Sequence, residues 1–553
     1  MELSREEYAR RYGPTVGDLV RLGDTDLRVH IDADDVGYGD EPMWGFAKNW
    51  RSRQAQQDRP TGSSELDMIL VGVTLIDPVL GVRKTNIGIK DGRIAGIGRA
   101  GNPDITDGVD LVIGPNTWPC NAYGLIATAG AVDSHVHAIT PRLVPVALSA
   151  GVTTLITAGF EEPVYVMDKT YRAFEHLPVN LGLQASARTD ARDPVERLIE
   201  AGACGLKIHE DWGAYPEIID ATLTLAQAHD VAVCLHTDGL NESAELEDTV
   251  AAIAGRTVHA YHVEGTGGGH FPDVIGLVRE PNIICSSTTP TLPYGRATAA
   301  EHLEMILAVH GGSIDVPEDV AAARERIHEG SMAAEGPLHD MGAISIINSD
   351  SQGMGRIGET VRRTWQLAHV MRTWAGEPAG HDNDRVLRYL AKYTVEPART
   401  HGIAAHVGSL EPGRLADVVL WDPRYFGVKP LLILKAGIFA WGALGEGNAS
   451  VEGAEPVRYG AHWGGTGGAA AALSTTFVSQ AALDARIVER LDSGRRFVAV
   501  EGTREVQRSS LLHNRAVPAI DVDPVDATVT LDGVVLAVAP VAEVPLSRRY
   551  LLG

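Results

Sequence analysis

The sequence predicts an α/β protein: a (β/α)8 barrel of the TIM type with a composite β domain built from both flanks of the barrel. Through the middle of the chain, short apolar runs alternate with helix-like segments about eight times, which indicates a parallel sheet closed into a barrel. On either side, residues 66–99 and 406–442 are rich in β-forming residues and turns instead. The length of 553 residues also exceeds what one ordinary core supports.

The apolar runs that should form the barrel strands are spaced along residues 125–351. They are LIATAGAVDSHVH (125–137), TTLITAG (153–159), VNLGLQAS (179–186), ACGLKIH (203–209), VAVCLHTD (231–238), TVHAYHVEG (257–265), NIICSSTTP (282–290) and AISIINSDS (343–351). Amphipathic stretches such as YPEIIDATLTLAQAHD lie between them and predict helices. A doubly wound open sheet is the alternative, but no G-x-G-x-x-G follows the first run, which disfavours it.

The two β-rich flanks are expected to form one domain, because a continuous barrel then lies between them. KDGR at 90–93 is a hairpin signal between two β-rich runs. The predicted limits are 1–128 for the N-terminal part of the composite β domain, 129–400 for the metal-dependent hydrolase barrel, 401–480 for the return of the β domain and 481–553 for a C-terminal extension. The uncharged stretch at 464–483 is expected to be a flexible linker that runs into a helix.

Composition excludes several classes of protein. A formal net charge of −24 argues against binding to nucleic acid, whose phosphates would be repelled. The four cysteines have no paired spacing, so we expect buried thiols rather than disulfides or a zinc knuckle. The N-terminus has no apolar signal-peptide core, and no uncharged apolar run has the roughly 20 residues of a membrane span. A cytoplasmic protein that binds neither membrane nor nucleic acid is therefore expected.

Ligating side chains stand at the ends of most of the predicted strands. In a barrel of this kind the carboxyl ends of the strands form the active-site face, so these side chains should converge. They are His135, His137, Lys207, His209, His236, His262 and Asp350. Each residue alone has an ordinary structural explanation, since a lone strand-end histidine is usually a hydrogen-bonded core residue and a lone aspartate a helix cap. Their co-occurrence predicts a site for divalent metal ions, without fixing which metal.

Lys207 requires a separate explanation, because a lysine in a buried strand costs several kcal/mol unless it is paired or neutralised. Its ammonium would repel two metal cations. After reaction with CO2 it would become a carbamate, whose two oxygens can bridge two metal ions at the spacing used in two-metal hydrolysis. Pairing of Lys207 with Glu210 or Asp211 is the alternative, and it leaves the histidines without a shared anion.

Several longer motifs make the chain similar to one family over nearly its whole length. They are AGAVDSHVHAI (129–139), AGACGLKIHEDWG (201–213), LHTDGLNES (235–243), HVEGTGGGHFPD (262–273), NSDSQGMGRIGE (348–359) and FGVKPLLILKAG (426–437). With these motifs the chain resembles the large, catalytic alpha subunits of ureases, which are nickel enzymes of the amidohydrolase superfamily. The resemblance implies hydrolysis of urea to ammonia and carbamate.

The resemblance also implies a role for each site residue. One nickel ion would be bound by His135, His137 and Asp350, the other by His236 and His262, and carbamylated Lys207 would bridge the two. His209 would hold the carbonyl oxygen of urea, and His310 would be a general acid on a mobile flap at 310–320, oriented by Asp211 and Arg326. The implied partners are urease beta and gamma subunits, commonly in a trimer of alpha–beta–gamma units, and accessory proteins that deliver nickel.

The chain also departs from the family pattern. Val309 replaces a cysteine before the flap histidine, and Gly311 stands where a second histidine is common. The loop at 158–174 is shorter than usual and contains Glu161 and Glu162, which either line the substrate pocket or cap the following helix. The segment 43–57 departs as well. Two alternatives therefore stay open: a binuclear hydrolase of another amide, and a poorly active urease-like paralogue.

Overall fold

The computed structural model describes most of the chain. The described residues are 3–60, 65–159, 163–209, 213–236, 246–265, 274–376, 380–443 and 459–546. None of the helices in these ranges combines the length and hydropathy that crossing a bilayer requires. The four cysteines all lie within these ranges and form no disulfide, and Cys204, Cys234 and Cys285 are buried, as the sequence predicts.

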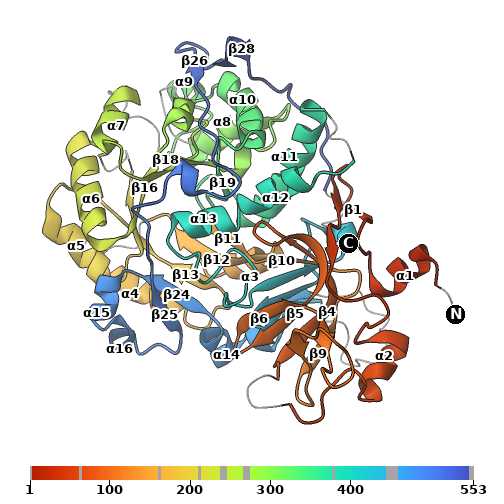
Figure 1. The fold of residues 1–553 in the computed structure, drawn as a ribbon. Helices are drawn as coiled ribbons and strands as arrows, with labels where there is room; N and C mark the ends of the chain where they lie inside the picture. The colour runs from red at the N-terminus through yellow and green to blue at the C-terminus, as the bar shows by residue number, and fades with distance from the viewer. Residues whose placement is uncertain are drawn as a thin grey trace.

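A closed parallel barrel forms the centre of the molecule and confirms the predicted fold class (Figure 1). Its strands are β11 (Ala131–Val136), β12 (Val152–Thr157), β13 (Asn180–Gly182) continued by β14 (Gln184–Ser186), β15 (Gly205–Ile208), β16 (Ala232–His236), β17 (Val258–Tyr261), β18 (Ile283–Thr288) and β19 (Ile346–Asn348). Neighbouring strands pair in parallel around the ring. A parallel bridge between Val136 and Ser351 closes it.

Helices surround the barrel and connect its strands (Figure 1). They are α3 (Leu143–Ser149), α4 (Val164–Ala173), α5 (Arg192–Glu200), α6 (Pro216–His229), α7 (Leu246–Ile253), α8 (Thr298–Val309), α9 (Pro317–Glu325), α10 (Glu329–Asp340), α11 (Thr360–Trp374), α12 (Asn383–Ala391) and α13 (Val395–Thr400), with the 3-10 helix η3 (Val274–Arg279). Helix α6 shows how the sequence sets such bounds. Pro216 occupies its first turn, where a missing N–H costs nothing, and Asp230 ends it in a left-handed conformation at φ 49°.

The two flanks join in a single sheet, which confirms the composite β domain. Its strands are β3 (Ala33–Asp34), β4 (Met68–Asp77), β5 (Gly81–Lys90), β6 (Arg93–Gly98), β9 (Trp118–Asn121), β10 (Ile126–Ala129), β20 (Val418–Trp421), β21 (Leu432–Lys435), β22 (Ile438–Ala443) and β23 (Tyr459–Ala461). The flanks meet where β10 pairs antiparallel with β20. The predicted hairpin turn lies between β5 and β6, where Asp91 and Gly92 both have positive φ, as a type I′ turn requires.

The C-terminal region contributes strands to the barrel sheet. The segment at 464–483 is not the predicted flexible linker, because it contains α14 (Gly467–Ala472), the buried strand β24 (Thr475–Val478) and α15 (Gln480–Asp484). This segment forms a strand because the barrel has an unpaired strand edge that it can pair with. The third strand is interrupted at Leu183, so β13 pairs with β24 while β14 pairs with β15. β25 (Arg496–Ala499) then pairs with β24. The domain limits expected from the sequence stay predictions.

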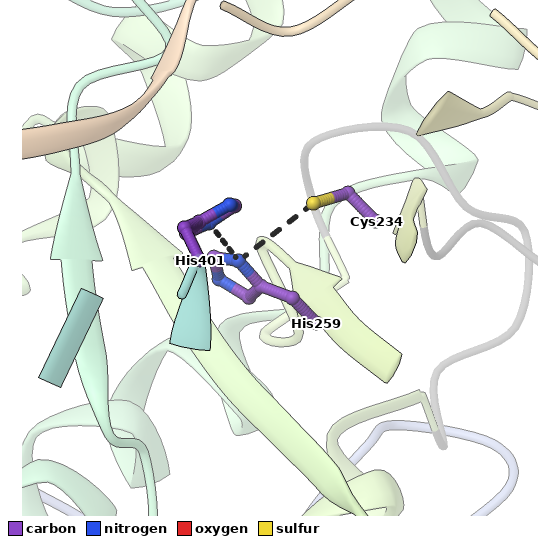
Figure 2. A group of neighbouring side chains, drawn as sticks. All are labelled: Cys234, His259 and His401. Carbon is purple, nitrogen blue, oxygen red and sulfur yellow. Dashed lines mark hydrogen bonds between the residues drawn. The ribbon is translucent and has the colours of Figure 1, made fainter. Parts of the chain in front are cut away.

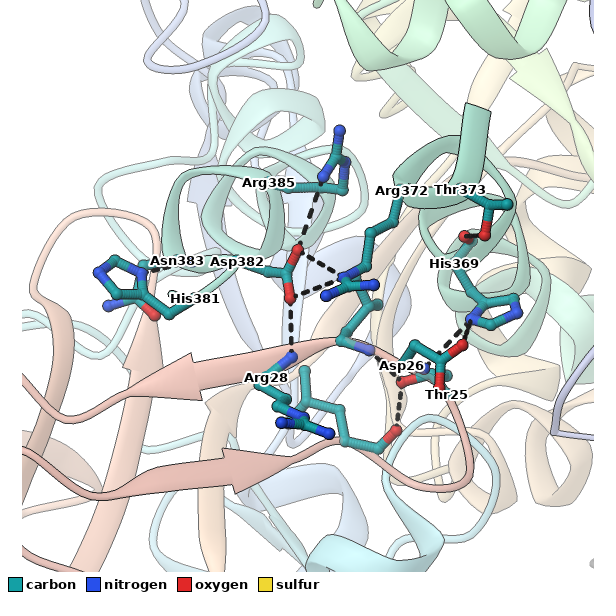
Figure 3. Close-up of polar contacts among 12 residues, drawn as sticks. Thr25, Asp26, Arg28, His369, Arg372, Thr373, His381, Asp382, Asn383 and Arg385 are labelled. Atoms are coloured by element: carbon teal, nitrogen blue, oxygen red, sulfur yellow. Dashed lines mark hydrogen bonds and ion pairs between the residues drawn. The ribbon is translucent and has the colours of Figure 1, made fainter. Parts of the chain in front are cut away.

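The remaining elements lie at the periphery. They are α1 (Arg5–Tyr12), β1 (Leu19–Arg21), β2 (Arg28–His30), α2 (Trp44–Arg51), β7 (Ala100–Gly101), β8 (Leu111–Val112), α16 (Ile487–Leu491), β26 (Ile520–Val522), β27 (Val529–Leu531) and β28 (Val534–Val535). The β1–β2 hairpin is held against the barrel helices by buried Asp382 (Figure 3). This carboxylate accepts hydrogen bonds from the backbone N–H of Arg28 at 2.9 Å and from Arg372 Nε at 3.1 Å.

A buried ion pair connects the β sheet to the barrel. Lys435 at the end of β21 contacts Asp417, which precedes β20, and both side chains are buried. Asp417 Oδ2 also accepts a hydrogen bond from Asn180 Nδ2 on β13 at 2.7 Å, and Lys435 Nζ lies 3.4 Å from the carbonyl oxygen of Thr153 on β12. Because the pair contacts strands of both domains, it fixes how the β domain sits on the barrel.

We predict that Lys435→Met lowers the free energy of unfolding by about 3–5 kcal/mol, because it leaves the Asp417 carboxylate buried without its cation. Guanidinium chloride denaturation measures the change. The matched control is Arg424→Met, which breaks an exposed ion pair with Asp422 and should cost at most about 1 kcal/mol. Equal effects of the two substitutions would contradict the structural role of the Lys435–Asp417 pair.

Candidate metal centre and active site

Three of the predicted ligands form one compact group at the carboxyl end of the barrel. His135 lies in β11, His137 follows that strand, and Asp350 follows β19. The Nε2 atoms of His135 and His137 lie 3.3 Å and 3.2 Å from Asp350 Oδ1. All three potential ligand atoms lie within 4.8 Å of one another. The structure therefore brings these residues together in an arrangement that could hold one metal ion.

A second group faces the same end of the barrel. His236 is the last residue of β16, and His262 follows β17. His236 Nδ1 and His262 Nε2 lie 2.9 Å apart, so two ring nitrogens point at one another. The ring of His209, which follows β15, stacks on His236 with 4.0 Å between ring centroids. His209, His236 and His262 thus form one side of a continuous cluster, and His135 and His137 form its other side, with His135 and His262 in ring contact.

Asp133 holds the first ligand group in place. It lies in β11 two residues before His135, and its Oδ1 accepts hydrogen bonds from the backbone N–H groups of Ser349 at 3.0 Å and His135 at 3.3 Å. Its Oδ2 accepts a hydrogen bond from the Thr360 hydroxyl at 3.0 Å. These bonds connect the first strand of the barrel to the segment that follows the last strand. They therefore set the position of Asp350 relative to the β11 histidines.

Lys207 is buried in β15, as predicted, and is near enough to interact electrostatically with both His135 and His236. Its Nζ lies 4.2 Å from the ring centroid of Tyr261, and that ring stacks on His135 at 3.9 Å. The Tyr261 hydroxyl donates to the carbonyl oxygen of Ser134 at 2.8 Å and accepts from Gln184 Nε2 at 3.0 Å. Tyr261 is therefore held at its hydroxyl, and its ring contacts both a predicted ligand and the lysine.

Sequence reasoning missed Tyr261 and Asp133 as parts of the site. Each residue could be recognised as part of the site only from its position on a strand relative to a predicted ligand. Tyr261 is the register partner of His236 on the neighbouring strand, so the two side chains occupy one level of the barrel. Asp133 precedes His135 by two residues and shares its face. Without knowing which strands are neighbours, neither position can be distinguished from an ordinary core residue.

The surroundings favour the metal-binding protonation states of His236, His262 and Asp350, and they keep His209 neutral. Burial lowers the pKa of His262 to about 3 and that of His209 to about 2, and it holds the pKa of His236 well below its ordinary value. Burial alone would raise the pKa of Asp350, but the hydrogen bond with His137 and the nearby charges of His137, His262 and Lys207 together outweigh it, so the pKa falls below the ordinary value. Neutral imidazoles and an ionised carboxylate are the forms that bind metal ions.

A cavity of about 780 Å³ opens onto both ligand groups. Its lining residues include His135, His137, Gly159, Val166, Thr170, His209, His236, Val309, His310, Asp350, Gln352 and Met354. Helix α4 contributes Val166 and Thr170, so the part of 158–174 that departs from the family pattern borders this cavity. Gly159 has φ 91°, and a Cβ there would lie 3.0 Å from Lys207 Cβ, so only glycine fits beside the lysine.

His310 reaches the cavity from the end of α8. Its Nε2 accepts a hydrogen bond from Arg326 Nη1 at 3.0 Å, and its Nδ1 donates to the carbonyl oxygen of Ile306 at 2.9 Å. Since guanidinium only donates and carbonyl oxygen only accepts, these bonds define the neutral Nδ1–H tautomer. The segment predicted as a loop at 310–320 is a loop only as far as Val316. Helix α9 begins at Pro317, which favours the first helical position.

Four positions named in the sequence predictions lie outside the described residues: Glu161, Glu162, Glu210 and Asp211. The helix expected after the two glutamates is present as α4, which begins at Val164. Whether the glutamates cap this helix or line the cavity stays a prediction, as does the role of Asp211. Arg326 is described, and it contacts the predicted general acid directly.

Two family models match the chain, one at its N-terminus and one over its central region. Residues 1–119 match the model described as the urease alpha-subunit N-terminal domain, and residues 126–455 match the amidohydrolase family model. The solved D-hydantoinase (dihydropyrimidinase) from Thermus sp. superposes with a TM-score of 0.50 at 15% identity, over 68% of this chain and 95% of that one. At this identity the likeness concerns the fold alone.

Full-length relatives identify the family more closely. The chain is 46% identical over 567 residues to urease subunit alpha of Haloquadratum walsbyi, with 100% of both chains covered. It is 48% identical over 557 residues to urease subunit alpha 1 of Streptomyces avermitilis, with 99% of both chains covered. Urease subunit alpha of Haloarcula marismortui is 45% identical over 565 residues, again with 100% of both chains covered. The chain therefore belongs to the urease alpha-subunit family of amidohydrolases.

Proposed function

We propose that this chain is the catalytic subunit of a urease and hydrolyses urea to ammonia and carbamate with two nickel ions. The observation that carries the proposal is the convergence of two ligand groups and a buried lysine on one cavity. One group is His135, His137 and Asp350, and the other is the His236–His262 pair. The family supports the same reaction, because full-length relatives at 45–48% identity are urease alpha subunits.

The donor set fits two divalent ions of nickel type. Imidazole nitrogens and one carboxylate suit such metals. His236 Nδ1 and His262 Nε2 face one another at 2.9 Å, and His262 Nδ1 is buried without a hydrogen-bond partner among the described residues. We propose that each group holds one ion and that Lys207, as its carbamate, supplies the shared anion. Two bound nickel ions would polarise the urea carbonyl and make hydroxide available at neutral pH.

His209 is proposed to bind the urea oxygen. It lines the cavity, and its stacking on His236 at 4.0 Å fixes the plane of its ring. A ring held in this way presents a donor N–H to the oxygen without reorganising during the reaction, which is the efficient way to stabilise developing negative charge. Its low pKa, caused by burial, keeps the ring neutral, so it acts as a hydrogen-bond donor rather than as a charged group.

His310 is proposed to give a proton to the departing nitrogen of urea. In the described arrangement both ring nitrogens are engaged, with Arg326 and with the carbonyl oxygen of Ile306. Proton transfer therefore requires that the segment 310–316 moves, that Nε2 leaves Arg326 and takes up a proton, and that the protonated ring then faces the cavity. A segment that closes over a small substrate and excludes water is a common device in hydrolases.

The protein works within a multisubunit urease, as its family implies. We propose that its partners are separate beta and gamma subunits in a trimer of alpha–beta–gamma units, and that accessory proteins deliver nickel. Neither nucleic acid nor membrane is a proposed partner, and the cytoplasm is the proposed location. The decisive experiment is ammonia release from urea by the assembled, nickel-loaded complex, with the nickel-free complex as control. No ammonia release at full nickel content would overturn the proposed function.

We predict that Lys207→Ala removes both metal binding and activity, because the shared anion is lost. Nickel content and ammonia release of the assembled complex measure the two effects. The matched control is Lys84→Ala, which replaces another fully buried lysine that contacts Tyr8 instead. That variant should keep two nickel ions per chain. Full nickel content and full turnover in the Lys207 variant would refute the carbamate role.

We predict that His310→Ala lowers turnover by about 10²–10⁴-fold, the usual contribution of a positioned proton donor. Nickel content should not change, since His310 belongs to neither ligand group. Steady-state kinetics with elemental analysis test both statements. Arg326→Met keeps the histidine and removes its hydrogen-bond donor, so it should cause a smaller loss of turnover and shift the pH–rate profile. Equal loss of nickel and turnover in His310→Ala would make His310 a ligand or a structural support.

We predict that Tyr261→Leu lowers nickel affinity by about 10–100-fold, because it removes the ring that supports His135 and Lys207. Competition with a nickel chelator measures this affinity. Tyr261→Phe is the matched control, since it keeps the ring and loses only the hydroxyl. It should retain nickel affinity within a few-fold and lose about 1–3 kcal/mol of stability, because Gln184 and Ser134 lose a hydrogen-bond partner. Equal nickel affinities in all three proteins would show that the ring has no supporting role.

A further inference from the structure

Besides the two proposed nickel-binding groups, a third group of ligand-type side chains lies inside the barrel and takes no part in the proposed reaction (Figure 2). It consists of Cys234 on β16, His259 on β17 and His401, which ends α13. All three side chains are buried, with at most 1% of their surface exposed. Their ligand atoms lie within 4.8 Å of one another.

Strand register places this group one level below the proposed nickel centre. Cys234 and His259 are register partners, as are His236 and Tyr261 two residues later on the same strands. Because side chains two residues apart share a face of a strand, Cys234 lies beneath His236. The ring of His259 meets the ring of Tyr261 edge-on, with 4.7 Å between centroids. Tyr261 therefore belongs to the upper level, with His236, and its ring contacts the level beneath through His259.

The spacing within the group is close to that of ligands around one ion, with one separation slightly shorter and one slightly longer than in such sites. His259 Nδ1 lies 3.1 Å from His401 Nε2 and 3.9 Å from Cys234 Sγ. Metal–nitrogen and metal–sulfur bonds of about 2.0–2.3 Å place neighbouring ligand atoms of three- and four-coordinate sites about 3.3–3.8 Å apart. As a purely hydrogen-bonded cluster, the same three groups would make one imidazole–imidazole bond and one long thiol contact. Coordination would engage all three ligand atoms at once.

We propose that Cys234, His259 and His401 bind one soft d10 cation and that this cation is Cu⁺. Thiolate sulfur with two imidazoles is a donor set of copper and zinc sites. Charge decides between them in this enclosed position. A thiolate neutralises Cu⁺ completely, whereas Zn²⁺ would leave a net positive charge buried in the barrel, which is costly. No fourth His, Cys, Asp or Glu among the described residues joins the group, and three-coordination suits Cu⁺.

The bound ion would connect three elements that are distant in the sequence. It would join neighbouring strands β16 and β17 to the end of α13, directly beneath Tyr261. Binding to the folded state alone raises thermal stability by mass action. The ion has no contact with the cavity, since none of its ligands lines it. Its role is to reinforce the floor of the active site, separately from urea hydrolysis.

The test measures copper in the assembled complex of the full-length chain, expressed with copper and nickel in the medium so that the enclosed site fills while the chain folds. Wild type should retain one more copper per chain after purification than Cys234→Ser, by elemental analysis. X-ray absorption at the copper edge should show one sulfur and two nitrogen ligands that Cys234→Ser loses. His401→Asn is the second variant, in case either substitution prevents folding, which circular dichroism reports.

Cys285→Ser is the matched control, because Cys285 is a buried strand cysteine outside the group. It should retain as much copper as wild type. Equal copper in wild type and in a folded Cys234→Ser or His401→Asn would overturn the proposal, as would zinc rather than copper bound through Cys234. Copper lost equally from the Cys285 control would also overturn it. Nickel content and urea turnover are measured on the same samples, so failure of the copper site is distinguished from failure of the proposed function.

Discussion

Closure of the barrel between its first and last strands is the constraint on which the site depends. Asp133 on β11 accepts hydrogen bonds from Ser349 N–H and from the Thr360 hydroxyl, both beyond the last strand. The parallel bridge between Val136 and Ser351 lies at the same seam. Asp350 is therefore held 3.2–3.3 Å from the two β11 histidines, although more than two hundred residues separate them in the sequence. An open sheet would leave these three side chains at opposite edges.

The interior of the barrel is built in polar levels. The upper level holds the proposed nickel ligands, and the level beneath contains Cys234 and His259. Tyr261 belongs to the upper level; its ring contacts both levels, through His135 and His259, and its hydroxyl is hydrogen-bonded. Buried polar groups cost free energy unless they are bonded to one another or to an ion. This cost explains why the levels are continuous networks rather than isolated histidines in an apolar core.

The β domain and the C-terminal region are attached by the same kind of interaction. Asp417 contacts Lys435 from the β sheet and Asn180 from the barrel, so one buried carboxylate serves both domains. Asn180 also accepts a hydrogen bond from the backbone N–H of Thr475, where β24 joins β13. The β domain, the barrel and the C-terminal strands thus meet at Asn180. The fold is consequently more integrated than its division into segments along the sequence indicates.

The sequence by itself determined the fold class, the joining of the two β flanks and the positions that converge at the carboxyl ends of the strands. It could do so because strand–helix alternation and the two-residue period of a strand are local properties, and His135, His137 and Lys207 carry both signals. Only the tertiary structure decided that Tyr261 contacts Lys207 and that 464–483 contains a buried strand. It alone placed Cys234 and His259 against His401. These contacts depend on which strands are neighbours, on strand register and on the strand edge left open at Leu183. Each of them pairs segments that are far apart in the chain, and no local sequence pattern specifies such a pairing.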